Sequence, residues 1–77
     1  MNYKKTISGE DAFQVLAHSF SLSPSEGGYT LQYSANCEDW TSYPDAVPSG
    51  ENLIVNGIAK GMYFRCLNNT SDLVLVY

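Results

Sequence analysis

Basic residues are scarce in this sequence, and they are not clustered. Four Lys and Arg residues stand against eight Asp and Glu residues, so the formal net charge is −4. Lys4 and Lys5 lie near the start of the chain, and Lys60 and Arg65 lie near its end. Because a surface that binds a polyanion needs clustered positive charge, we expect no direct contact with nucleic acid.

Long hydrophobic runs are also missing. No stretch approaches the roughly 18 apolar residues that a membrane span requires. No apolar run follows Lys4 and Lys5 either, as it would in a secretory signal. We therefore expect a complete small product, made in the cytoplasm, that does not bind a membrane.

Cysteine and histidine are too few for most site chemistry. Cys37 and Cys66 are not enough for a disulfide scaffold, and their spacing fits no zinc motif. A bridge between them stays open, but two free thiols are favoured in a reducing compartment, with Cys66 as a small core residue. His18 is the only imidazole, and its neighbours form no recognisable catalytic triad.

Carboxylates occur in two pairs, Glu10-Asp11 and Glu38-Asp39, both on predicted turns. A calcium loop needs more carboxylates at a defined spacing, so solvated turn charges are favoured over a metal site. The sequence predicts no catalytic residue, no metal and no cofactor, and hence no enzyme.

What the sequence does contain is large apolar side chains in short segments. Hydrophobic residues make up 44% of the 77 positions and aromatic residues 13%, which predicts one folded domain over residues 1–77. Turn signals at residues 23–28, 44–50 and 68–71 separate the segments, a pattern typical of a small all-β sandwich or barrel. Residues 1–7 are predicted to form a flexible N-terminal arm.

Several segments show the alternation of a strand. Tyr29, Leu31 and Tyr33 share one face, which we expect to point inward. In residues 62–67 the even-numbered positions, which include Phe64 and Cys66, are expected on one face. Residues 73–77, LVLVY, are almost wholly apolar, which is typical of a strand buried on both faces or covered at an interface.

The first third of the chain has two interpretations. Phe13, Leu16, Ala17 and Phe20 fall at helical spacing, which would suit one short helix within residues 9–18. The same region also alternates as strands, with a change of phase before Phe20 that a β-bulge would produce. We favour strands, and the short N-terminal helix stays open.

The later segments resemble an immunoglobulin-like sandwich. YTLQYSANCEDWTSY, ENLIVNGIAKGMYFRC and SDLVLVY are similar to strands C, C′, E, F and G of fibronectin type III modules. This resemblance, over about residues 28–77, implies a small antiparallel β-sandwich with Tyr63 in the place of the corner tyrosine. The first segment also resembles the hairpin of discoidin-type carbohydrate modules, which has Asp-Gly in its turn. Because Cys tolerates positive φ poorly, we expect the turn at Asn36-Cys37 to be longer or differently shaped.

The aromatic residues of that hairpin have two possible roles. Tyr29, Trp40 and Tyr43 could stack on a sugar ring, which would make the chain a carbohydrate-binding, discoidin-like adhesion module. Because a sandwich this small needs its Trp in the core, burial of Trp40 is favoured over display.

A second resemblance bears on function. Small acidic β-modules with segments such as YTLQYSA and GMYFR resemble accessory structural proteins of tailed bacteriophages. The resemblance implies a non-catalytic virion protein that decorates the capsid or forms part of a tail fibre. Its implied partner is the major capsid protein or another virion scaffold.

We place the partner-binding residues in the two terminal segments. The LVLVY segment could add to the sheet edge of a partner or be shared in a homo-oligomer. The residues expected to bind a partner are Tyr3, Lys4, Lys5, Leu73, Val74 and Tyr77.

Overall fold

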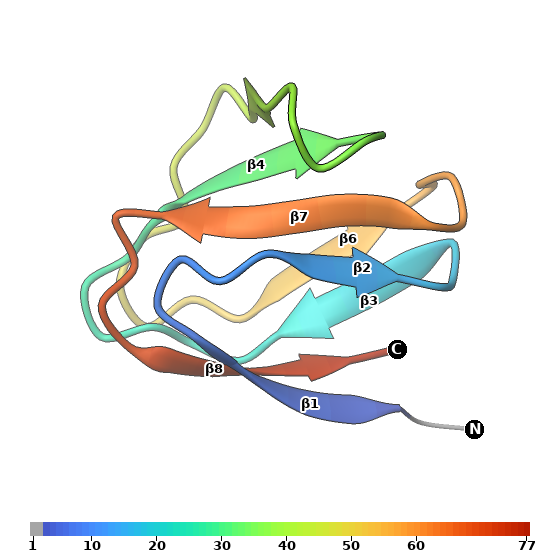
Figure 1. Ribbon diagram of the computed structural model, residues 1–77. Coiled ribbons are helices and arrows are strands. Elements are labelled where there is room, and N and C mark those ends of the chain that lie inside the picture. Colours follow the sequence, from blue (N-terminus) through green and yellow to red (C-terminus); the bar gives the residue numbers. More distant parts are fainter. Residues whose placement is uncertain (1–2) are drawn as a thin grey trace.

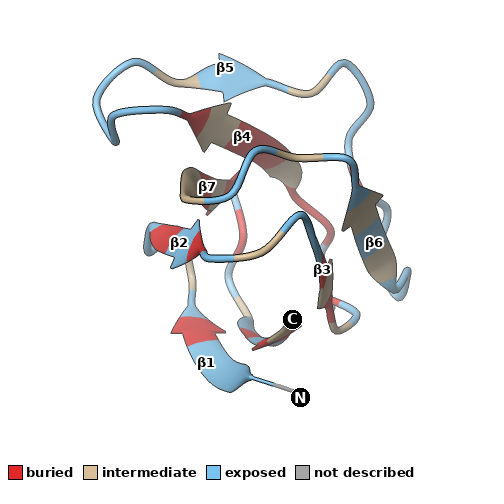
Figure 2. Ribbon diagram, turned by 90° about the vertical axis from the view of Figure 1, so that its right-hand side faces the viewer, coloured by how far each residue is buried: buried red, intermediate tan, exposed pale blue. Residues whose placement is uncertain are grey.

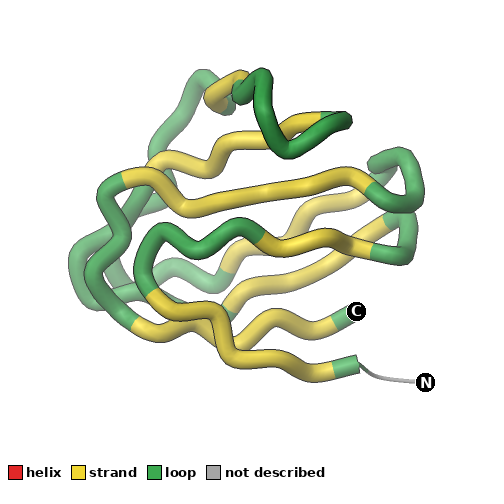
Figure 3. The backbone as a smooth tube through the Cα atoms, in the orientation of Figure 1, coloured by secondary structure: helices red, strands yellow, loops and turns green. Residues whose placement is uncertain are grey.

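The protein folds into eight short β-strands. A computed structural model describes residues 3–77, which contain no helix (Figures 1 and 3). The all-β prediction is therefore confirmed, and the optional N-terminal helix is absent. The described residues accordingly include no helix that could cross a membrane. The strands are β1 (Lys4–Ser8), β2 (Phe13–Val15), β3 (Ser19–Leu22), β4 (Thr30–Ser34), β5 (Thr41–Ser42), β6 (Leu53–Asn56), β7 (Met62–Leu67) and β8 (Asp72–Val76).

The strands form two four-stranded antiparallel sheets that pack as a sandwich. Sheet A has the order β1-β8-β3-β6, and sheet B has the order β2-β7-β4-β5. The pairs β1–β8, β2–β7, β3–β6 and β4–β5 are nested, as in one long hairpin with its tip between β4 and β5. This hairpin is rolled so that β3 also pairs with β8 and β4 with β7, which is the strand order of an eight-stranded jelly roll.

The strand order differs from that of a fibronectin type III module. In immunoglobulin-like sandwiches strands F and G lie in the same sheet, whereas β7 lies in sheet B and β8 in sheet A. The sandwich architecture thus agrees with the sequence, but the connection after β7 crosses between the sheets.

A buried cluster of hydrogen-bonded polar groups joins three of the connections that cross between the sheets. The side chain of Asn69, only 4% exposed, donates hydrogen bonds to the carbonyl oxygens of Gly9 (2.9 Å) and Ser71 (2.7 Å), and it accepts one from the Ser25 hydroxyl (3.1 Å). These residues lie on the β1–β2, β3–β4 and β7–β8 connections, each of which passes from sheet A to sheet B or back. Hydrogen bonds to a buried amide compensate the cost of burying it.

The core lies between the facing sides of the sheets (Figure 2). At its centre Phe20 from sheet A packs against Phe13 and Phe64 from sheet B, with ring centroids 4.7–6.0 Å apart. Phe64 and Cys66 are fully buried, as their alternation in β7 predicts. Tyr29 and Leu31 are buried as expected, whereas Tyr33 is half-buried at the rim.

The expected N-terminal arm is largely a strand. β1 pairs with β8 along its whole length, and the backbones of Tyr3 and Tyr77 exchange two further hydrogen bonds of 2.7 and 3.0 Å. Ile7 anchors β1 in the core. The prediction of a flexible arm over residues 1–7 is therefore wrong for residues 3–7, because the backbone of this segment is hydrogen-bonded to the C-terminal segment. Residues 1–2 lie outside the described residues.

The phase change in the first third of the chain is not a bulge. β2 belongs to sheet B and β3 to sheet A, so residues 16–18 carry the chain from one sheet to the other. Phe13 and Phe20 consequently point into the same core from opposite sides. A crossing between sheets reverses the phase in the same way that an inserted residue would.

The C-terminal strand is not buried on both faces. Leu73 and Leu75 are buried, but Val74 between them is 40% exposed. β8 is also an inner strand of sheet A, with β1 on one side and β3 on the other. It therefore has no free edge that it could add to the sheet of a partner, which corrects that expectation.

The turn at Asn36-Cys37 is long, as expected, but Cys37 does adopt a positive φ of 62°. Six residues separate β4 from β5. The Asn36 side-chain oxygen accepts hydrogen bonds from the backbone N–H groups of Glu38 (2.9 Å) and Asp39 (3.0 Å). This side-chain cap fixes the turn and holds Cys37 in the left-handed region.

Candidate functional site

The outer face of sheet A exposes apolar side chains. Alternation along the strands directs one set of side chains to the core and the other set to this face. Val74 and Ile54 are the large hydrophobic residues exposed on it, 40% and 64% respectively. We call it the sheet A face and define it by Lys4, Thr6, Ser19, Ser21, Ile54, Asn56, Asp72, Val74 and Val76.

The strand register aligns these residues across the sheet. Lys4 lies opposite Val76, Val76 opposite Ser21, and Ser21 opposite Ile54, so that one row crosses all four strands. Of the face residues only Lys4 and Asp72 carry a charge. The surface is therefore mainly a mixture of aliphatic and small hydroxyl side chains, whose hydroxyl groups would need hydrogen-bond partners in an interface.

The predicted partner-binding residues divide between the two sides of sheet A. Lys4 and Val74 lie on the sheet A face. Tyr3 and Tyr77 pack against each other with ring centroids 4.7 Å apart, and Lys5 is exposed. These three residues alternate in phase with Ile7 and Leu75 and therefore lie on the inner side of the sheet, at its end. The structure thus brings the two terminal segments together, which the sequence did not indicate.

Leu73 is the exception among the predicted partner-binding residues. Its side chain is fully buried in the core. It cannot touch a partner while the protein is folded, and it contributes to stability instead.

The outer face of sheet B is covered by its own side chains. The Arg65 guanidinium lies 4.4 Å from the centroid of the Trp40 ring, and its Nε donates to the Gln32 side-chain oxygen (2.6 Å). The Gln32 amide in turn donates to the Ser42 hydroxyl (2.9 Å). A cation–π contact and two hydrogen bonds thus connect β5, β4 and β7 on this side.

Trp40 therefore does not belong to the core, contrary to the favoured prediction. It is half-buried against Arg65, outside the core cluster. Ser42 pairs with Gln32 and faces outward, and Trp40, two residues earlier, takes the same side. The physical reason is the register of β4 with β5, which sets which residues near the hairpin face inward.

The three residues proposed to bind a glycan do not share a surface. Tyr29 is 4% exposed in the core, Trp40 lies on the outer face of sheet B, and Tyr43 packs inward against Tyr33 at 5.1 Å. Burial raises the pKa of the Tyr43 hydroxyl, with a smaller contribution from Tyr33. No common stacking platform results from this arrangement.

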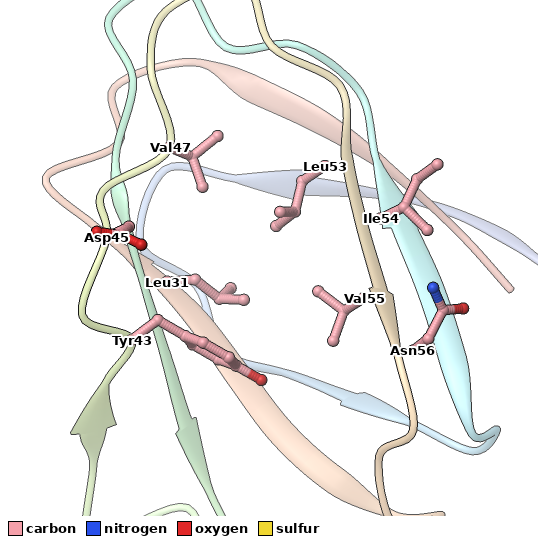
Figure 4. A pocket seen from close by; sticks show the side chains of 8 residues that line it. All are labelled: Leu31, Tyr43, Asp45, Val47, Leu53, Ile54, Val55 and Asn56. Atoms are coloured by element: carbon pink, nitrogen blue, oxygen red, sulfur yellow. The ribbon is translucent and has the colours of Figure 1, made fainter.

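A pocket opens between the two sheets at the edge where β6 and the β5–β6 connection lie (Figure 4). It has a volume of about 300 Å³. Aliphatic side chains dominate its lining, Tyr43 and Asp45 add polar groups, and Ile54 and Asn56 border it from the other side of β6. We call it the edge pocket; its lining residues are Leu31, Tyr43, Asp45, Val47, Leu53, Ile54, Val55 and Asn56.

The titratable side chains singled out from the sequence lie apart from the edge pocket. His18 is exposed, and its Nδ1 lies 2.9 Å from the Ile58 carbonyl oxygen, so this nitrogen donates. Glu10 accepts a hydrogen bond from the backbone N–H of Asn68, which makes it a loop cap. Within residues 3–77 no three His, Cys, Asp or Glu side chains are grouped so that they could hold a metal ion.

Both cysteines are free thiols, which settles the alternative left open by the sequence. Cys37 is exposed at the tip of the β4–β5 hairpin, and Cys66 is buried in β7. Burial raises the pKa of the Cys66 thiol to about 12. Cys66 is therefore protonated at neutral pH and behaves as the small core residue that was predicted.

Sequence reasoning missed the sheet A face as a unit and the edge pocket entirely. No prediction was made for Ile54 itself, although it is the most exposed large hydrophobic residue among the described residues. Neither surface has a sequence motif, because each is assembled from strands that are distant in the chain. Comparison with known proteins gives no further guidance, since no family model, curated protein or solved structure matches this chain.

Proposed function

We propose that this chain is a non-catalytic structural protein of a virion, which docks on the capsid lattice of a tailed bacteriophage through the sheet A face. The observation that carries the proposal is the composition of this face. It exposes Val74 and Ile54 among Ser and Thr side chains, and its charged residues are Lys4 and Asp72.

Lys4 and Asp72 stand at the starts of β1 and β8, so the middle of the face, with Ser21, Ile54 and Val74, carries no charge. Depletion of charge is characteristic of the central part of protein interfaces. Lys4 lies on this face at the edge strand β1, and its charge would help to orient the module on its partner.

The choice of a capsid as partner depends on two analogies. The segments YTLQYSA and GMYFR resemble those of phage accessory proteins, and the jelly-roll strand order occurs in viral capsid and lectin domains. A fold hosts many functions, so this supports the partner class by analogy only.

Binding to capsids tests the proposal. The purified protein is mixed with expanded capsids that lack accessory proteins, and the bound fraction is measured by co-sedimentation over a range of concentrations. We expect saturable binding that Val74→Asp weakens tenfold or more, because a carboxylate is then placed in the interface centre.

A matched control comes from another exposed aliphatic residue. Leu16 is 55% exposed on the β2–β3 connection, so Leu16→Asp adds the same charge away from the sheet A face and should leave binding unchanged. Failure of the wild-type protein to bind, or equal loss with both variants, would contradict the proposed docking surface.

A further inference from the structure

The four sheet edges of the sandwich are not equally protected. Native proteins blunt exposed edges with charged residues, especially Lys, or with very short strands. β1 carries Lys4 and Lys5, while β2 has three residues and β5 has two. β6, with the sequence LIVN, is four residues long and has neither a charge nor a proline.

The unprotected β6 edge adjoins the edge pocket. Figure 4 shows the side chains of Leu53 and Val55 directed into the pocket, with Ile54 and Asn56 on the other side of the strand. An added strand would place every second side chain toward the same space. The volume of about 300 Å³ leaves room for a large apolar side chain, since a single water accounts for about 30 Å³.

The charged residues next to the pocket and the start of β6 are acidic. Asp45 lines the pocket, and Glu51 lies two residues before β6. Residues 6–59 contain no Lys or Arg. A partner segment with basic residues would therefore be complementary to the edge, and an acidic one would be repelled.

We propose that the β6 edge and the edge pocket bind an extended peptide segment of another protein. The segment adds to sheet A as a fifth strand, inserts an aliphatic or aromatic side chain into the pocket, and places Lys or Arg near Asp45. Main-chain hydrogen bonds supply affinity in this mode of recognition, and the pocket supplies selectivity. This site shares Ile54 and Asn56 with the sheet A face, but it uses the backbone edge of β6 and the pocket, and it does not depend on the identity of a capsid partner.

A second copy of this chain is a poorer occupant. Pairing two β6 strands would bring Asp45 and Glu51 of both copies near the same interface, where the carboxylates would repel one another. It would also leave both pockets unfilled, because Leu53 and Val55 already line the pocket of their own subunit. An extended segment from a different protein avoids both problems.

The test uses a defined set of synthetic peptides. Each has the pattern Arg-Thr-X-Thr-X-Thr-Arg, where X is Val, Ile, Leu or Phe, and binding is followed by NMR titration of the isotope-labelled protein. We expect at least one peptide to bind saturably, with shift changes centred on residues 43–47 and 53–56. Peptides with Glu in place of Arg, or with the two X residues adjacent, should bind at least several-fold more weakly.

Two variants test the two parts of the site. Val55→Phe fills the pocket and should abolish measurable binding. Asp45 is exposed, so Asp45→Lys is not expected to affect folding; it should weaken binding of the Arg peptides by about two- to fivefold, as is usual for an exposed charge pair. The peptides with Glu in place of Arg should bind the Asp45→Lys variant more tightly than they bind the wild-type protein. Glu38→Lys, which makes the same charge change on the β4–β5 hairpin, is the control and should have no effect.

Three results would overturn the inference. The first is that no peptide binds at millimolar concentration. The second is that the NMR shift changes are centred on β1 or on the outer face of sheet B. The third is a doubled mass in solution that Val55→Phe reduces to that of one chain, because the occupant would then be a second copy. Capsid binding through the sheet A face is tested separately by Val74→Asp, and Val74 does not line the edge pocket, so the two proposals can fail independently.

Discussion

Tyr29 offers a sharp test of the core, because removing part of its side chain should stabilise the protein. Its hydroxyl is buried and has no hydrogen-bond partner among the described residues. Its backbone, in contrast, is held by two hydrogen bonds to Val47, of 3.0 and 2.7 Å. Tyr29→Phe therefore deletes an unpaired polar group without disturbing the strand.

The magnitude follows from two opposing contributions. An unsatisfied buried hydroxyl costs about 1–3 kcal/mol. Loss of the oxygen leaves a void of roughly 10–15 Å³, which costs only about 0.3 kcal/mol at ~24 cal/mol per Å³. We therefore expect a net gain of about 1 kcal/mol or more, which for a domain of this size raises Tm by about 4–8 °C.

Urea unfolding measures the change. Fluorescence of Trp40 is a suitable signal, because its ring leaves the Arg65 guanidinium when the protein unfolds. Tyr33→Phe is the matched control, since Tyr33 is only half-buried and its change should stay within about 0.5 kcal/mol. A loss of 1 kcal/mol or more in Tyr29→Phe would refute the reasoning, because the hydroxyl would then be hydrogen-bonded in the folded protein.

Tyr29→Phe should also change how the stability of the protein depends on pH. Burial, followed by the charges of Cys66 and Glu51, raises the pKa of the Tyr29 hydroxyl well above its usual value. The unfolded chain then releases this proton first, so the folded state binds more protons and its stability falls as the pH rises above about 10. Tyr29→Phe should reduce this alkaline loss in urea titrations at pH 9–11, while the part that comes from Cys66 and Tyr43, whose pKa values burial also raises, remains. An unchanged slope would contradict the assigned burial of Tyr29.

Two further predictions concern the backbone and the thiols. Gly28→Ala should destabilise the protein by about 2 kcal/mol or more, because φ is +74° and a Cβ would lie 2.7 Å from the Val47 carbonyl oxygen. At Gly50 φ is +79° and an added Cβ would have no atom within 4 Å, so Gly50→Ala should lower the free energy of unfolding by only about 1 kcal/mol. Equal losses for both variants in urea unfolding would exclude the contact with Val47 as the cause. A thiol reagent at pH 8 should react rapidly with Cys37 and with Cys66 only after unfolding; two rapid equivalents would show that Cys66 is accessible.

The features that sequence predicted well are those with a local period. The alternation in residues 62–67 identified the buried side of β7, with Phe64 and Cys66 inward, before any partner strand was known. A strand has its side-chain period of two wherever it pairs. Fold class and most of the core could therefore be derived from the sequence.

The features that sequence predicted poorly depend on pairing. Lys4 pairs with Val76 across the length of the chain, which turned a supposed arm into an edge strand. Trp40 follows the register of β5 with β4, and it faces outward although its size favoured the core. In both cases the deciding contact involves a residue that the local pattern does not specify.

By itself, then, the sequence determined an all-β sandwich, the inward faces of its clearest strands, and an acidic surface with few basic groups. Only the tertiary structure decided the nested strand order, the joining of the two terminal segments at the sheet A face, and the position of β6 as the unprotected edge beside a pocket. The physical reason is that alternation is encoded residue by residue, whereas surfaces and edges arise from hydrogen-bonded register between segments far apart in the chain.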